Sequence, residues 1–229
     1  MHKVMICMPG TSFSSKTITC ISNLLKYFYR QGIQYKFSST FSRNIYETRN
    51  MCLLGDPSKG KDQLPFDGDD YSHILWIDDD IIFNIKDIER LFKVDKDIVS
   101  GLYLMASGDN YAAVEYWDEE YFKQNGYFRF LSKTDLKNRD SIFTVSYVGF
   151  GFLLIKKGVF EQFEYPWFNA VYIKIKSSED FCMEDVGFCL KCKDSNIPIY
   201  VDPQIKVTHC KTAYLKWMIF GQRTIGMNI

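Results

Sequence analysis

Three consecutive aspartates, Asp78, Asp79 and Asp80, directly follow the apolar run at residues 73–77, His-Ile-Leu-Trp-Ile. An apolar run of this length predicts a buried strand, which delivers three carboxylates to its carboxyl end. Like charges repel and carboxylates are costly to desolvate, so packing alone gives no reason for such a cluster. A divalent cation removes the conflict, and Mg²⁺ or Mn²⁺ prefers oxygen ligands. The triplet therefore predicts either a metal site or an acidic, solvated turn.

The orientation of the three side chains follows from the strand. If the extended conformation continues through the triplet, Asp78 and Asp80 point to one side and Asp79 points to the other. We therefore expect Asp78 and Asp80 to do the chemistry and Asp79 to be expendable.

Strands and helices alternate through the first hundred residues. Apolar runs predict strands at 3–8, 33–37, 73–77 and 97–101, and helices at about 14–31 and 44–54. A third helix is predicted to follow Asn84, with Ile85, Ile88, Leu91 and Phe92 facing inward. Ile18, Ile21, Leu25 and Phe28 keep helical spacing on the first helix, and Asn84 with Asp87 forms a capping box on the third. This order predicts an α/β fold with a mostly parallel central sheet flanked by helices, which binds ligands at the carboxyl ends of its strands.

The second half of the chain shows a different pattern. Aromatic residues accumulate from 102 to 147, followed by an apolar segment at 147–156, an acidic segment at 177–185 and a helix to Asn196. Two further strands are predicted at 197–201 and 205–208, the second ending at His209. We expect a single domain over 1–229, with a ligand-binding half at 1–101, a second half at 102–211 and a C-terminal tail at 212–229.

Composition excludes several classes of protein. Of the 229 residues 46% are hydrophobic and 24% are charged, with 28 basic and 28 acidic side chains, so disorder and a global attraction to nucleic acid are not expected. The N-terminal apolar run is too short for a signal peptide, and no apolar run is long enough to span a bilayer. We therefore expect a cytoplasmic protein. The seven cysteines are expected to be reduced and mostly buried, although Cys189, Cys192, His209 and Cys210 leave a zinc site as an alternative.

A phosphate-binding loop is the first interpretation of these acids. Residues 10–17, Gly-Thr-Ser-Phe-Ser-Ser-Lys-Thr, follow a strand and open a helix, and Lys16 with Asp78 or Asp79 would complete a nucleoside triphosphatase site. However, Ser15 replaces the glycine that lets the backbone bend around phosphates. A helix N-cap at Ser14 or Ser15 is the interpretation we favour for this segment.

The second interpretation depends on motifs along most of the chain. They are Arg49-Asn50, the aspartate triplet, Val148-Gly149-Phe150-Gly151, Glu184-Asp185-Val186-Gly187, Asp202-Pro203 and Val207-Thr208-His209. In this order and spacing, residues 3–211 resemble the GT-A class of nucleotide-sugar-dependent glycosyltransferases, in the broad family-2-like group. The resemblance implies transfer of a hexose from a UDP- or GDP-sugar, UDP being favoured, to a glycan or other hydroxyl acceptor, with inversion.

The resemblance also implies a metal site. The aspartate triplet matches the family's D-x-D motif, which holds Mn²⁺ or Mg²⁺, and His209 matches a late histidine ligand. Asp78, Asp80 and His209 are thus the expected metal residues, with Asp80 binding directly and Asp78 acting through ribose or water. A metal ion stabilises the leaving diphosphate as a Lewis acid.

Other positions take their expected roles from the same resemblance. Asp185 matches the general base, with Glu184 beside it, and a helix N-terminus at this point would lower the pKa of Asp185. Glu179 and Asp180 form a second acidic pair that stays open as an alternative. The positions expected to bind the donor are Pro9, Thr11, Arg49, Asp78, Asp79, Gly149, Gly151 and Lys211.

An inert domain that binds carbohydrate or a divalent ion remains a third interpretation. On either carbohydrate-related interpretation Tyr116 or Trp117 could stack on a sugar ring, although most of the 19 Phe and 15 Tyr must be core residues.

Overall fold

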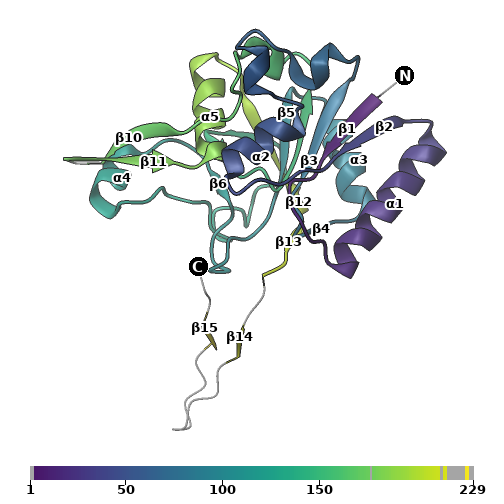
Figure 1. Ribbon diagram of the computed structural model, residues 1–229. Coiled ribbons are helices and arrows are strands. Elements are labelled where there is room, and N and C mark those ends of the chain that lie inside the picture. Colours follow the sequence, from purple (N-terminus) through teal and green to yellow (C-terminus); the bar gives the residue numbers. More distant parts are fainter. Residues whose placement is uncertain (1–2, 176, 212–213, 216–224, 227–229) are drawn as a thin grey trace.

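A seven-stranded mixed sheet forms the centre of the computed structural model, which describes residues 3–175, 177–211, 214–215 and 225–226 (Figure 1). Five strands run in the same direction, and β9 and β7 run opposite to them. In spatial order the strands are β2 (Gln34–Ser38), β1 (Lys3–Cys7), β3 (His73–Ile77), β9 (Phe152–Lys156), β5 (Ile98–Leu102), β12 (Ile199–Lys206) and β7 (Phe143–Val145). The predicted α/β class with a central sheet is confirmed.

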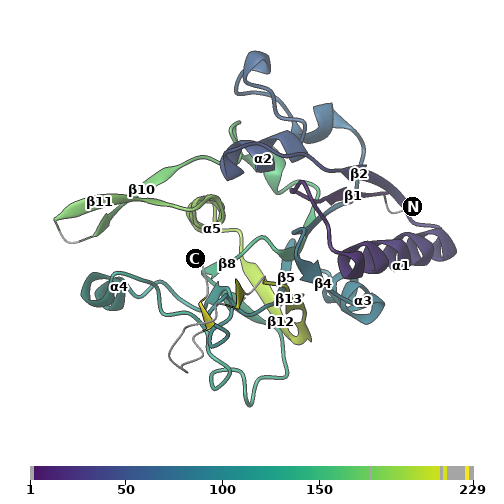
Figure 2. The same cartoon turned by 60° about the horizontal axis from the view of Figure 1, so that its bottom comes forward.

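Helices cover both faces of this sheet. Alternate residues of a strand point to opposite faces, and both faces of the central strands carry apolar side chains that the helices bury. On one face α1 (Ser15–Gln31) and α3 (Ile85–Val94) pack against Ile6, Leu75 and Val99. On the other face α2 (Ile45–Cys52) and α5 (Glu184–Asp194) pack against a core that includes Trp76 and Leu153. Figure 2 shows α1 and α3 on one side of the strands and α2 and α5 on the other.

Several predicted helix signals are confirmed. Ser14 caps α1 by accepting a hydrogen bond from the Thr17 amide, and Asn84 and Asp87 form the capping box of α3. The inward face of α1 was partly mispredicted, since Ile18 is 54% exposed and Leu24 is fully buried. The buried stripe of α1 therefore runs through Ile21, Leu24 and Phe28, and Ile18 in the first turn lies outside it.

One pair of predicted strands is in fact a single strand. β12 runs without a break through Asp202 and Pro203, with a register irregularity between Val201 and Lys206. The bulge accommodates a proline that has no N–H to donate. Arg90 of α3 donates two hydrogen bonds of 3.0 Å to the buried carboxylate of Asp202, which stabilises this irregular segment.

Short elements surround the sheet. The pair that positions the site is β4 (Ile81–Ile82) with β13 (Thr208–His209), and another pair is β6 (Ala113–Val114) with β8 (Tyr147–Val148). The hairpin of β10 (Val171–Ile175) and β11 (Ser178–Cys182) lies beside α5, and α4 (Glu119–Asn125) lies below it in Figure 1. The remaining elements are 3₁₀ turns at Pro57–Lys59, Pro65–Gly68 and Phe160–Gln162, and the pair β14 (Tyr214–Leu215) with β15 (Ile225–Gly226).

Two further expectations meet the structure here. None of the helices within the described residues is long and apolar enough to cross a membrane. All seven cysteines are free, and five of them are buried, as predicted: Cys7, Cys52, Cys182, Cys189 and Cys192. Most of the predicted tail at 212–229 lies outside the described residues.

Candidate active site

A cavity of about 350 Å³ lies where β1 and β3 end, at the carboxyl edge of the sheet. Most of the predicted donor and metal residues meet there. The lining residues are Pro9, Gly10, Phe41, Ser42, Arg43, Ile45, Thr48, Arg49, Asp78, Asp79, Asp80, His209 and Lys211. We call this the acidic cavity.

The aspartate triplet forms a turn instead of continuing β3. The amide of Ile81 donates to the carbonyl of Asp78 at 3.1 Å, which closes the turn. The strand rule of alternating side chains therefore does not apply, and the prediction that Asp79 points away is wrong, since Asp79 also lines the acidic cavity. Burial, with the charges of Asp80 and Asp78, raises the pKa of Asp79.

Gly10 lies in the turn that follows β1, and its lack of a side chain leaves room for Asp79. Its φ of +149° suits glycine, and a Cβ at this position would stand 2.3 Å from Oδ2 of Asp79. On the other side, the hydroxyl of Thr17 donates to the carbonyl of Asp79 at 3.2 Å, so α1 also holds the acidic turn.

Asp80 meets His209 because β13 pairs antiparallel with β4. His209 lies opposite Ile81, and the amide of Cys210 donates to the carbonyl of Asp80 at 2.8 Å. Nε2 of His209 then lies 3.2 Å from Oδ2 of Asp80, and Nζ of Lys211 lies 2.8 Å from the same oxygen. Burial alone would raise the pKa of Asp80, but hydrogen bonds from His209 and Lys211 lower it.

The spacing of Asp80 and His209 fits a divalent cation. Two ligand atoms about 2.1 Å from one ion, at adjacent octahedral positions, lie about 3 Å apart. No group of three or more acidic, histidine or cysteine side chains gathers around one point in the described part of the chain. Mg²⁺-like ions often take only one or two protein ligands and complete their shell with phosphate oxygens and water. The two residues fit an ion of that kind.

Asp78 has a different partner. Arg49, only 3% exposed, donates to both carboxylate oxygens of Asp78, at 2.8 and 3.3 Å. With both oxygens engaged, the expected role of Asp78 in metal binding has no support in this geometry and stays a prediction. Asp78 is instead part of a buried, charge-assisted pair.

Arg49 joins the acidic cavity to the start of α5. Its Nε donates to Glu184 at 3.3 Å, and its guanidinium lies 5.3 Å from the ring centres of Trp76 and Phe150. Burial alone would lower the pKa of Arg49, but Asp78 and Glu184 raise it above its ordinary value. A permanent cation thus bridges two acids predicted for different tasks.

Asp185 follows Glu184 in the first turn of α5. The hydroxyl of Tyr147 donates to its Oδ2 at 2.8 Å, and the amide of Val186 donates to its Oδ1 at 2.8 Å. Burial, with the neighbouring charge of Glu184, raises the pKa of Asp185 to about 7. The prediction that the helix terminus lowers this pKa is wrong, because desolvation outweighs the hydrogen bonds and the dipole.

Gly149 and Gly151 have a structural reason that the sequence did not reveal. A Cβ at Gly149 would stand 2.1 Å from the hydroxyl of Tyr103, and a Cβ at Gly151 would stand 2.8 Å from its ring. Gly151 nevertheless borders the acidic turn, since its carbonyl accepts the Asp78 amide at 3.0 Å. Their expected contact with a donor sugar stays a prediction.

Other predicted residues lie outside the acidic cavity. Thr11 is exposed and does not line it. Glu179 and Asp180 are exposed on β11, where Glu179 lies 3.9 Å from Lys174 in a surface ion pair. These three positions receive no support from the geometry.

The phosphate-binding-loop alternative also finds no support. The hydroxyl of Ser14 accepts from the Thr17 amide at 3.0 Å, which is an ordinary N-cap. Lys16 is exposed and does not line the cavity that contains Asp78 and Asp79.

Three residues of this region were missed from the sequence. Tyr103 packs against His209, Tyr147 binds Asp185, and Arg43 is exposed at the acidic cavity with no ion pair in the described part of the chain. The position of Tyr103 directly after a predicted strand was a usable signal, because ligands meet such positions. Tyr147 and Arg43 carried no comparable signal.

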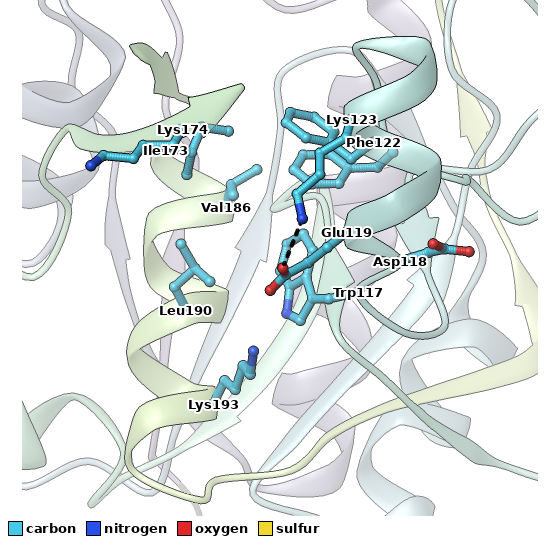
Figure 3. A pocket seen from close by; sticks show the side chains of 11 residues that line it. Trp117, Asp118, Glu119, Phe122, Lys123, Ile173, Lys174, Val186, Leu190 and Lys193 are labelled. Carbon is cyan, nitrogen blue, oxygen red and sulfur yellow. Dashed lines mark ion pairs between the residues drawn. The ribbon is translucent and has the colours of Figure 1, made fainter. Parts of the chain in front are cut away.

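A second cavity of about 350 Å³ lies between α4, the β10–β11 hairpin and α5. Figure 3 shows Lys123 of α4 and Lys193 of α5 approaching it from opposite walls, with Trp117 between them. Val186, the residue after Asp185, also lines it. The other lining residues are Asp118, Glu119, Phe122, Phe128, Ile173, Lys174 and Leu190.

Comparison with known proteins gives a likeness in structure only. No protein-family model and no curated protein sequence matches this chain. Among solved structures, the catalytic domain of Drosophila β1,4-galactosyltransferase 7 in complex with xylobiose is 12% identical, with a TM-score of 0.52 over 93% of this chain and 72% of that chain.

Two further solved structures match at similar levels. A mutant of the same Drosophila enzyme in complex with manganese, UDP-Gal and xylobiose gives a TM-score of 0.50 at 12% identity, again over 93% of this chain and 72% of that chain. The protein A197 from STIV gives 0.50 at 17% identity, over 96% of this chain and 100% of that chain. The chain thus has a GT-A-like fold, which at these identities says nothing of its reaction.

Proposed function

We propose that this chain is a metal-dependent glycosyltransferase that moves a hexose from a UDP- or GDP-sugar to a hydroxyl acceptor with inversion. One observation carries the proposal: Arg49 joins Asp78 of the acidic cavity to Glu184, next to a carboxyl group with a pKa of about 7. A donor-binding end and a proton-accepting end are thereby held in one connected site.

Asp80 and His209 hold the metal ion in this proposal. Mn²⁺ is favoured over Mg²⁺, since imidazole is among the ligands that suit transition metals. The bound ion supplies Lewis-acid stabilisation of the leaving diphosphate. Lys211 and Arg43, both lining the same cavity, can meet phosphate oxygens by charge-assisted hydrogen bonds. The Drosophila structure, which contains manganese and UDP-Gal, supports the choice of Mn²⁺ and a UDP-sugar.

Asp185 is the proposed general base. A base with a pKa near the working pH is ionised in a useful fraction and still accepts a proton readily. Glu184 is 4% exposed and bound to Arg49, so it positions the start of α5 and raises the pKa of its neighbour. A single carboxylate that deprotonates the acceptor hydroxyl leads to direct displacement and inversion.

The acceptor is proposed to enter from the cavity between α4 and α5. Trp117, Phe122 and Phe128 offer aromatic surface to sugar rings, while Lys123 and Lys193 offer hydrogen-bond donors. Val186 in the wall of this cavity places it one residue from the proposed base.

A panel of nucleotide sugars tests the proposal. With Mn²⁺, wild-type protein should release nucleoside diphosphate from at least one donor, and Asp185→Asn should lower the rate by about 10²–10⁴. Asp194→Asn, at the exposed far end of the same helix, is the matched control and should keep full activity.

Two results would refute the proposal. Folded protein that binds Mn²⁺ and nucleotide but turns over no donor would indicate an inert binding domain. Stabilisation by ATP that Lys16→Ala abolishes would favour a nucleoside triphosphatase.

A further inference from the structure

Tyr103 is buried between His209 and the backbone at Gly151. It directly follows β5 and is only 8% exposed. Its ring meets the ring of His209 edge to face, with 5.1 Å between centres. Its hydroxyl accepts a hydrogen bond from the amide of Gly151 at 3.1 Å. The side chain therefore contacts both the late histidine and the strand that borders the acidic turn.

Two glycines make room for this side chain. A Cβ at Gly149 or at Gly151 would overlap Tyr103, at 2.1 Å from the hydroxyl and 2.8 Å from the ring. The carbonyl of Gly151 in turn accepts the amide of Asp78 at 3.0 Å. Tyr103 is thus locked between His209 and the backbone that begins the acidic turn.

The residue after Tyr103 determines the tautomer of His209. Nδ1 of His209 lies 2.8 Å from the carbonyl of Leu104, and a carbonyl can only accept, so Nδ1 carries the hydrogen. When the ring is charged, Nε2 donates to Oδ2 of Asp80 at 3.2 Å. When the ring is neutral, Nδ1 keeps its hydrogen and Nε2 has the free lone pair that a metal ion needs. An imidazole fixed in this way is ready to bind a metal ion.

We propose that Tyr103 and Leu104 act as positioning residues for His209, and that Tyr103 is the larger contributor. The ring of Tyr103 restricts rotation of the imidazole, and the carbonyl of Leu104 selects its tautomer. The inference rests on the proposed function, in which His209 and Asp80 hold the metal ion. Neither residue touches the reacting atoms in this arrangement.

Nitrogen-15 NMR of the imidazole rings in the metal-free protein gives the first test. The chain has three histidines, so His209→Gln assigns the signal. In alkaline buffer, the neutral ring of wild-type His209 should show one tautomer with hydrogen on Nδ1. Tyr103→Leu should give a mixture, whereas Tyr103→Phe should retain the single tautomer because it keeps the ring.

Mn²⁺ affinity, measured by paramagnetic resonance of the free ion, gives the second test. Tyr103→Leu should weaken binding 10–100-fold, the range typical for groups that orient a metal ligand. Tyr103→Phe should stay within about 3-fold. Tyr71→Leu is the matched control, since Tyr71 is 3% exposed and lies in the other core cluster, and it should also stay within about 3-fold.

A single unchanged tautomer in Tyr103→Leu, or equal Mn²⁺ affinity in Tyr103→Leu and Tyr71→Leu, would overturn the inference. If Tyr103→Leu does not fold, Gly149→Ala carries the same expectations, because its Cβ would stand 2.1 Å from the hydroxyl and 3.1 Å from Cζ of Tyr103 and would displace the ring as well as the hydroxyl. The tautomer experiment decides the matter even when wild-type protein binds no Mn²⁺, an outcome that would count against the proposed function alone.

Discussion

Asp185 shows how far the surroundings of one carboxyl group can move its pKa. Burial and the charge of Glu184 raise it to about 7, whereas an unperturbed aspartate titrates near 4. The folded protein therefore binds a proton at Asp185 more tightly than the unfolded chain does. Between about pH 4 and pH 7 this group makes the free energy of unfolding fall as the pH rises.

Replacing Asp185 by asparagine should remove this penalty. Above pH 7, Asp185→Asn should raise the free energy of unfolding by about 1–2 kcal/mol. This is a part of what the full pKa shift implies, because asparagine replaces one of the two hydrogen-bond-accepting oxygens with an NH2 group. Below pH 4 the two proteins should be equally stable. Urea unfolding at pH 4 and pH 8 measures both values, and a variant less stable at pH 8 would contradict the raised pKa.

The activity should also depend on the ionisation of Asp185, but it should rise with pH where the stability falls. The wild-type rate should rise with pH through an apparent pKa near 7, as Asp185 loses its proton and can act as a base. A pH–rate profile of kcat/KM measures this value. A rate that is flat between pH 5 and pH 8 would exclude Asp185 as the base.

Arg49 is the residue on which the buried charges depend. Arg49→Met would leave Asp78 and Glu184 without their shared cation and should lower the free energy of unfolding by about 3–5 kcal/mol. Arg139→Met, which removes a half-buried pair with Glu115, should cost about 1 kcal/mol or less. Equal losses of the free energy of unfolding in the two variants would contradict the claim that the buried Arg49 pairs stabilise the fold more than a half-buried pair does.

At the scale of elements, the site depends on short segments that bring distant residues together. β13 pairs with β4 and so places His209 beside Asp80, although 129 positions separate them in the sequence (209 − 80). The turn after β1 also lies against the acidic turn, since a Cβ at Gly10 would overlap the side chain of Asp79. These contacts lie between segments that carry little periodic signal of their own.

Gly10→Ala tests the contact between the two turns. The new methyl group would overlap Asp79 in addition to straining the backbone, so we expect a loss of about 2–3 kcal/mol and weaker Mn²⁺ binding. Gly32→Ala also places an alanine at positive φ (+65°), in the left-handed helical region, but has open space around its Cβ and should cost about 1 kcal/mol. Equal losses, with unchanged Mn²⁺ affinity, would contradict a role for Gly10 in shaping the turn.

For the whole molecule, the sequence predicted the fold better than the site. The apolar strands and capped helices are local signals, and they were enough to predict the sheet and the helices beside it. The partners of Asp78 and Asp80 were beyond such signals, because Arg49 and His209 reach them only after the chain folds. The turn at residues 78–81 likewise could not be told from a longer strand, since both follow an apolar run.

The raised pKa of Asp185 was unpredictable for the same reason. A helix N-terminus is visible in a sequence, but the burial that outweighs it depends on residues from other segments, such as Tyr147. The resemblance to glycosyltransferases indicated which residues to compare, and the geometry then changed what several of them are proposed to do. Asp78, expected near the metal ion, pairs with Arg49 in the structure. Tyr103, for which the sequence predicted no role, packs against His209.

Calorimetric titration of UDP and GDP, with and without Mn²⁺, tests the central claim most directly. We predict that one of the two nucleotides binds wild-type protein at least ten times more tightly with Mn²⁺ present, and that Asp80→Asn removes this gain. Asp62→Asn, an exposed acid in the loop before β3, should leave it intact. Nucleotide binding that is the same with and without Mn²⁺, or that survives Asp80→Asn unchanged, would contradict a metal-dependent site at Asp80 and His209.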